Sequence, residues 1–174
     1  MESTEDTQQH ARRPGHERGR KDAESSPHAV SARDVDEAAQ RLSHVARLTA
    51  VYEIDRLTEA AGVRVLVKRE DQQVVRSFKL RGAYNRMAQL SESERQAGVV
   101  CASAGNHAQG VAMACAQLGI HGTIFLPSST PRQKRRRIAT IGGPWITMQF
   151  VDGTFDETQA VALAAAERSW KNYI

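Results

Sequence analysis

The chain has 174 residues, a formal net charge of +4 and 40% hydrophobic residues, which is enough for one folded domain with a core. No apolar run approaches membrane-spanning length, and no apolar segment follows Arg12 and Arg13 as an export signal would require. Cys101 and Cys115 form neither a disulfide framework nor a metal-ligand pattern. We therefore expect no metal site, no membrane association and a cytoplasmic location.

The first part of the chain has a different composition from the rest. Up to about His28, alanine and methionine are its only apolar residues, among many charged and polar ones. Such a segment cannot bury enough apolar surface to offset the loss of chain entropy. We predict a disordered tail over residues 1–29 and a folded region over residues 30–174.

Helical and strand patterns alternate from Val30 onward. Ser31 and Asp34 have the spacing of a capping box, and apolar residues follow at helical intervals. A second, short helix is predicted over residues 52–61 and is followed by a strand over residues 63–67.

The next two helices also have recognisable starts. We expect Ser77 to cap the helix that carries Lys79, because a serine hydroxyl can accept a hydrogen bond from the first turn. Ser91 and Glu94 form another capping box, and Gly98 is expected to end that short helix.

Strand and helix signals continue to the end of the chain. Residues 99–102 read as a strand, residues 103–106 as a turn, and an alanine-rich helix follows and ends at Gly119. A further strand is predicted over residues 123–126.

The last part repeats this alternation. Thr130 is expected to cap a helix that has Pro131 at its first position and that Gly142 and Gly143 end. A strand over residues 145–151 and a final helix over residues 156–170 follow. Strands separated by helices of this length indicate βαβ units. The predicted fold class is α/β, with a parallel sheet covered by helices on both faces.

Basic residues gather between Arg132 and Arg137. Such a run is compatible with nucleic-acid binding or with a solvated helix face. No aromatic residues or base-reading motif accompany it, and its positions wrap around a helix. The solvated face is the favoured interpretation.

Lys79 is the first candidate for chemistry. A lysine at a helix start is most often a solvated surface residue. Here Phe78 and Leu80 flank it with apolar side chains, and Arg81 adds a second cation. Desolvation and like charge both disfavour an ammonium ion, which leaves an amine able to condense with an aldehyde or to act as a base.

The turn at residues 103–106 is the second candidate. Gly105 permits an unusual backbone angle, and successive N–H groups before a helix can converge on a carboxylate or phosphate, with Ser103 and Asn106 as side-chain donors. An ordinary capped turn is an equally good interpretation. His107 receives no catalytic role, and residues 68–71 are either a charged edge, the favoured interpretation, or the rim of a site.

Three motifs together carry a family resemblance. They are Lys68–Asp71, Ser77–Tyr84 and Ser103–Gly110, and the similarity runs from about Val30 to about Arg168. The chain resembles the biosynthetic threonine dehydratases, within the tryptophan-synthase-β-like, fold-type-II pyridoxal-phosphate enzymes.

The resemblance implies a role for each motif residue. Lys79 would form the internal aldimine with pyridoxal 5'-phosphate, Phe78 would pack beside the cofactor ring, and Asn106 would hydrogen-bond the cofactor's 3-hydroxyl. The loop that receives the substrate carboxylate would comprise Ser103, Gly105, Asn106 and His107.

The implied activity is the deamination of L-threonine, or more slowly of L-serine. Threonine would yield 2-oxobutanoate and ammonia, the first step of isoleucine biosynthesis, in a homo-oligomer of the full-length family type that binds no nucleic acid. Two alternatives stay open. One is serine racemase or a catabolic serine/threonine dehydratase of the same fold, and the other is an inactive remnant or a basic nucleic-acid-binding module.

The chain also departs from the family pattern. Thr49-Ala50-Val51 stands where the family usually has Thr-Pro-Leu. The family's glycine-rich phosphate loop, its partner for the pyridine nitrogen and its regulatory region come further downstream than Ile174. We therefore expect a truncated catalytic domain that corresponds to the family's amino-terminal portion.

Overall fold

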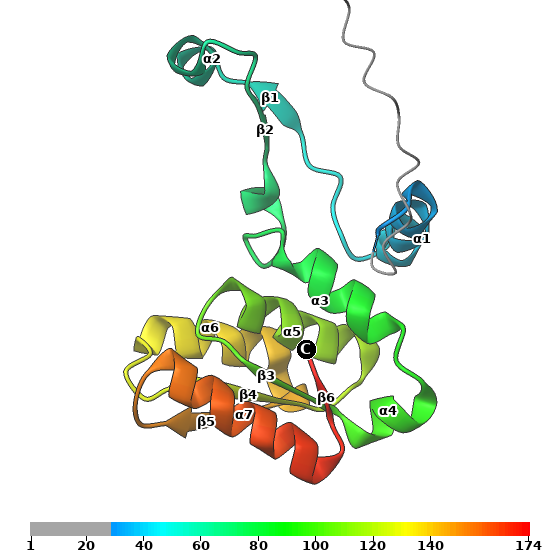
Figure 1. Ribbon diagram of the computed structural model, residues 1–174, viewed down its shortest axis with the longest axis vertical. Coiled ribbons are helices and arrows are strands. Elements are labelled where there is room, and N and C mark those ends of the chain that lie inside the picture. Colours follow the sequence, from blue (N-terminus) through cyan, green and yellow to red (C-terminus); the bar gives the residue numbers. More distant parts are fainter. Residues whose placement is uncertain (1–28) are drawn as a thin grey trace, which may run out of the picture.

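The computed structural model describes residues 29–174 (Figure 1). The predicted disordered tail, apart from residue 29, lies outside the described residues. The elements in chain order are α1 (Ala32–Leu42), β1 (Val51–Glu53), α2 (Asp55–Ala61), β2 (Leu66–Lys68), η1 (Glu70–Gln72), α3 (Lys79–Ala88), α4 (Glu92–Ala97), β3 (Val99–Ala102), α5 (Asn106–Leu118), β4 (Gly122–Pro127), α6 (Arg132–Gly142), η2 (Gly143–Trp145), β5 (Ile146–Val151), α7 (Phe155–Ser169) and β6 (Asn172–Tyr173).

The main sheet is parallel and has the strand order β5-β4-β3-β6. Helices connect its first three strands in sequence, so the predicted α/β class is confirmed. Strand β6 was not predicted, because two residues give no periodicity. It is held by its place at the edge of β3, where the Ile174 N–H donates to the Val100 carbonyl at 2.9 Å.

The sheet lies between two layers of helices, as Figure 1 shows, and an apolar cluster fills each side. Strand β3 is buried on both faces and alternates between them, since successive side chains of a strand point to opposite sides. Val99 and Cys101 join the core under α3, α5 and α6, whereas Val100 and Ala102 pack against α7. Helices on both faces confirm the predicted arrangement.

The predicted helix starts are confirmed where the capping residue and its partner are three residues apart in the sequence. Capping boxes at Ser31 and Ser91 are confirmed. The predicted caps at Ser77 and Thr130 are wrong, because α3 and α6 have Phe78 and Pro131 at the N-cap position. Both hydroxyls are buried, and neither has a hydrogen-bond partner among the described residues.

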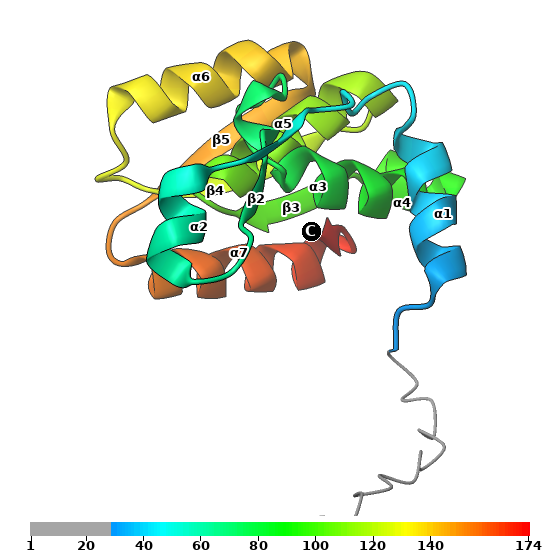
Figure 2. The same ribbon diagram turned by 90° about the horizontal axis from the view of Figure 1, so that it is seen from above.

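The segment from β1 to β2, here called the arm, differs from its prediction. The helix expected over residues 52–61 begins only at Asp55, and Tyr52 lies in β1, paired antiparallel with Val67 of β2. Helix α2 and strand β1 bury no side chain. The arm extends away from the layered body, while α1 lies beside α3 at one end of it (Figure 1, Figure 2).

Candidate active site

Helix α3 presents Lys79 on the side that does not enter the core. Its buried residues are Leu80, Ala83, Tyr84 and Met87, which form one stripe at helical spacing. Lys79, Gly82 and Arg86 lie three and four positions apart on another side of the helix. The amphipathic pattern of α3 therefore turns the candidate lysine toward a cavity instead of into the core.

A cavity of about 310 Å³ contains the candidate lysine. It brings together α3, the first turn of α5 and the end of the chain beyond β6. Its lining residues are Phe78, Lys79, Arg81, Gly82, Ala83, Arg86, His107 and Ile174. Phe78, Lys79 and His107 were predicted as site residues, while Arg86 and Ile174 were not.

A close approach of two helices makes this meeting possible. A Cβ atom at Gly110 of α5 would lie 3.0 Å from the carbonyl carbon and oxygen of Lys79, tighter than side chains normally allow. The absence of a side chain at Gly110 thus lets the backbone of Lys79 rest on α5. This contact places the lysine next to the turn that precedes α5.

The surroundings of Lys79 differ from the prediction that apolar neighbours desolvate it. Lys79 is exposed, Leu80 points into the core, and the Phe78 ring is 58% exposed. The Lys79 Nζ atom lies 5.5 Å from the centroid of that ring, within the range of a cation–π contact. The aromatic ring therefore lies near the amine but leaves it exposed to solvent.

Arg81 was expected to act on Lys79 as a second cation, but its charge is paired with an acidic side chain. The Arg81 guanidinium donates through Nε and Nη2 to the Glu70 carboxylate, at 2.8 and 2.9 Å. Thr49 adds a hydrogen bond of 2.7 Å from its hydroxyl. Hydrogen bonds from Arg81, followed by those from Thr49 and Gln73, lower the pKa of Glu70 to about 2 against the opposing effect of burial.

The segment Lys68–Asp71 is only partly the charged edge that was favoured. Arg69 and Asp71 pair with each other at the surface, at 2.8 Å. The Glu70 side chain, in contrast, is only 15% exposed and points toward Arg81. Sequence reasoning missed this inward orientation because the partner is eleven residues away and no periodic pattern links the two positions.

The turn before α5 has the predicted position but not the predicted glycine geometry. Gly105 has φ −126°, outside the left-handed region, and a Cβ there would meet open space. The Gly105 N–H donates to the Ser103 hydroxyl oxygen at 3.2 Å, so the Ser103 proton stays available for another acceptor. Helix α5 begins at Asn106, and the N–H groups of its first turn have no intrahelical partners.

The predicted site residues are only partly gathered into one cavity. His107 reaches the cavity of Lys79, and its Nε2 lies 3.0 Å from the main-chain oxygen of Ile174. Ser103 is buried at the end of β3 and Asn106 is exposed, but neither they nor Gly105 line that cavity. Their assigned roles stay predictions.

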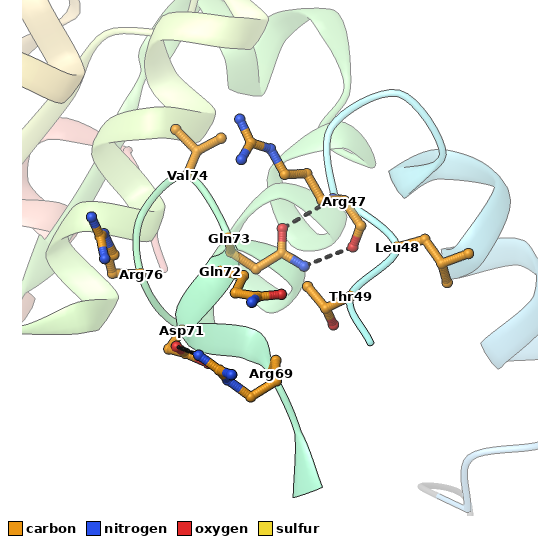
Figure 3. A pocket seen from close by; sticks show the side chains of 9 residues that line it. All are labelled: Arg47, Leu48, Thr49, Arg69, Asp71, Gln72, Gln73, Val74 and Arg76. Atoms are coloured by element: carbon orange, nitrogen blue, oxygen red, sulfur yellow. Dashed lines mark hydrogen bonds and ion pairs between the residues drawn. The ribbon is translucent and has the colours of Figure 1, made fainter. Parts of the chain in front are cut away.

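A larger cavity, of about 720 Å³, lies at the base of the arm (Figure 3). Its lining residues are Arg47, Leu48, Thr49, Arg69, Asp71, Gln72, Gln73, Val74 and Arg76. The Gln73 amide spans it and exchanges two hydrogen bonds with the backbone of Arg47, at 3.0 and 2.8 Å. It contains no lysine, histidine or cysteine, so the smaller cavity is the better candidate for covalent chemistry.

The two cysteines and the basic run do not line the cavity of Lys79. Burial raises the pKa of both cysteine thiols, that of Cys115 to about 12, and the described residues hold no cluster of metal ligands. In the basic run, Arg135 binds the carbonyls of Ser128 and Thr130, and Arg137 donates to Gln109 at 2.6 Å. The run is therefore not one continuous cationic stripe.

Within residues 29–174, no helix is both long enough and apolar enough to cross a bilayer.

Comparison with known proteins gives consistent matches. Residues 42–174 match a family described as pyridoxal-phosphate dependent enzymes. The biosynthetic L-threonine dehydratase IlvA of Mycobacterium tuberculosis is 50% identical over 146 residues, which are 83% of this chain and 34% of that protein. The chain thus spans about a third of the length of the curated relatives it matches.

Solved structures resemble the chain as well. The processed form of threonine deaminase isoform 2 from Solanum lycopersicum has a TM-score of 0.68 at 41% identity, over 81% of this chain and 40% of that chain. Maize serine racemase has a TM-score of 0.71 at 28% identity, over 80% of this chain and 42% of that chain.

Proposed function

The chain belongs to the pyridoxal-phosphate dependent enzyme family, and from this premise we propose that it carries the cofactor lysine and the carboxylate-binding turn of a biosynthetic threonine dehydratase. The reaction would eliminate water from L-threonine, and hydrolysis of the resulting enamine would then release ammonia and give 2-oxobutanoate. The observation that supports this proposal most directly is the shared cavity of Lys79, Phe78 and His107 beside the start of α5.

The residues of this cavity fit the cofactor's chemistry. An exposed amine with an aromatic ring 5.5 Å away suits an aldehyde attached to a pyridine ring. Lys79 would hold the aldehyde carbon, Phe78 would lie beside the ring, and the Asn106 amide would hydrogen-bond the 3-hydroxyl. When bound, pyridoxal phosphate supplies an electron sink for the charge left at the substrate's Cα.

The chain's own residues would bind and orient the substrate. The N–H groups at the start of α5 and the hydroxyl proton of Ser103 provide donors for a carboxylate, and Gly105, whose N–H binds the Ser103 oxygen, lies between them. Their hold on the carboxylate would fix the direction of the Cα–H bond. His107 lies next to this turn and is assigned to the same loop.

Lys79 would also act as the base. As a free amine its Nζ can take the Cα proton, after which the bond from Cβ to the hydroxyl breaks and the oxygen leaves as water with one added proton. The released enamine tautomerises in solution and is hydrolysed to 2-oxobutanoate and ammonia.

We favour a threonine dehydratase over a serine racemase because the chain is more similar in sequence to the dehydratase. Identity is 50% to the dehydratase of M. tuberculosis but 28% to maize serine racemase. The nucleic-acid alternative is less supported, since Arg135 and Arg137 already donate hydrogen bonds to oxygen atoms of the protein itself. L-Serine is proposed as a slower substrate.

The test transfers the matching segment of this chain into the M. tuberculosis dehydratase in place of the equivalent residues, and follows 2-oxo acid formation. We expect 2-oxobutanoate from L-threonine and less pyruvate from L-serine. A Lys79→Ala version should lose the activity, while Lys134→Ala, at an exposed lysine of α6, should retain it. Formation of D-serine without 2-oxobutanoate would assign the segment to a racemase.

A further inference from the structure

The Glu70 carboxylate accepts hydrogen bonds from three parts of the chain. Both Arg81 contacts come from α3, Thr49 donates from the segment before β1, and the Gln73 amide lies 3.4 Å from each carboxylate oxygen. The Lys68 ammonium is 4.0 Å away. A carboxylate with this many donors at a mostly buried position fixes the geometry of every group that contacts it.

Arg81 connects this network to the cavity of Lys79. Both residues line the cavity, and Arg81 is two positions after Lys79 in the first turn of α3. The Arg81 fork binds Glu70 through two parallel hydrogen bonds, which restrains the orientation of that turn as well as the guanidinium.

The charged side chains that line the cavity with Lys79 are basic. They are Arg81 and Arg86 of α3, the titratable His107 belongs to α5, and Ile174 contributes a main-chain oxygen. Among the described residues that line it, none has an acidic side chain. The acidic side chain that binds a member of this set is Glu70, through Arg81.

We propose that Glu70 is a positioning residue for Lys79: Glu70 holds the first turn of α3 through Arg81 and compensates the Arg81 charge in the cavity that Lys79 shares. This inference rests on the proposed function and deepens it, because it names what positions the proposed cofactor lysine and compensates a charge in its cavity. Glu70 touches neither the cavity nor Lys79 directly, so it acts through Arg81.

The test measures the reactivity of the Lys79 amine without any cofactor. Competitive acetylation with acetic anhydride across a range of pH, followed by mass spectrometry, gives a midpoint pH for Lys79, with Lys134 and Lys171 as references in the same sample. The variants are Glu70→Gln, Arg81→Gln and the double substitution, with Glu59→Gln on α2 as the matched control at an exposed glutamate.

The variants should shift the Lys79 midpoint in opposite directions. Glu70→Gln leaves Arg81 uncompensated, which disfavours a second cation and lowers the midpoint by about half a pH unit. Arg81→Gln leaves Glu70 uncompensated and raises it. The double variant and Glu59→Gln should stay at the value of the parent protein.

A purely structural role for Glu70 would not give opposite signs. Equal midpoints in the folded variants, or shifts of the same sign, would overturn the inference. If Glu70→Gln does not fold, the rise expected for Arg81→Gln decides the matter alone. Capture of pyridoxal phosphate by the same samples tests the proposed function separately, because acetylation of Lys79 does not require the cofactor.

Discussion

Glu70 is the residue whose charge contributes most clearly to stability. Its folded-state pKa of about 2 lies below the ordinary 4.5, chiefly because Arg81 donates to the carboxylate. The folded protein therefore binds the Glu70 proton less tightly than the unfolded chain does. The resulting stabilisation is complete above about pH 4.5 and is lost as the pH falls through about 2.

The first prediction follows from this titration. Glu70→Gln should lower the stability at pH 7 by about 2 kcal/mol, or the melting temperature by about 5 °C, since hydrogen bonds to a charged group are lost. Thermal unfolding at pH 7 and at pH 2 measures the effect, and the difference from the parent protein should shrink at the lower pH. Glu59→Gln should change little at either pH, and a Glu70→Gln deficit that persists undiminished at pH 2 would contradict the interpretation.

At the scale of elements, the packing of α3 on α5 determines where Lys79 lies. Gly110 and Gly82 belong to the two helices and differ in their surroundings. A Cβ at Gly110 would press on the Lys79 carbonyl at 3.0 Å, whereas a Cβ at Gly82 would meet no heavy atom within 4 Å. The same substitution at the two positions should therefore have opposite effects.

Gly110→Ala should destabilise the protein by about 1–3 kcal/mol, because the two backbones must separate. Gly82→Ala should instead stabilise it by up to about 1 kcal/mol, since alanine is the better helix residue and has room. Urea unfolding midpoints measure both. Equal effects of the two substitutions would show that α3 and α5 are not in close contact.

Sequence patterns predicted the elements that depend on neighbouring residues and missed those that depend on distant ones. The boxes at Ser31 and Ser91 were predictable because each capping pair lies within one helical turn. Strand β1 was missed because its partner β2 lies beyond α2, and β6 was missed because its pairing with β3 depends on the assembled sheet. Long-range pairing decides these elements more than local propensity does.

The candidate site likewise contains residues that the sequence predicted and a contact that it did not predict. Lys79, Phe78 and His107 were predicted from local motifs, and they share a cavity because α3 packs on α5 near the starts of both helices. The Glu70–Arg81 contact was not predicted, since its formation depends on how η1 folds against α3. The exposed position of Lys79 also differs from the expectation based on its sequence neighbours.

For the whole molecule, the buried thiols report whether the sheet and its helices are assembled. Cys101 of β3 and Cys115 of α5 lie in the same core, and burial raises the pKa of both. We expect neither to react with Ellman's reagent at pH 8 in native buffer, and both to react at once in guanidinium chloride. Rapid reaction of either thiol in native buffer would mean that this core is not closed.

Lys79 is the amine that we expect to bind pyridoxal phosphate in the whole molecule. The most direct measurement incubates the protein with the cofactor, reduces the adduct with borohydride and maps the modified lysine by mass spectrometry. We predict one dominant modification at Lys79, which Lys79→Ala abolishes and Lys134→Ala leaves intact. Equal labelling of Lys68, Lys134 and Lys171, or unchanged incorporation in Lys79→Ala, would contradict it.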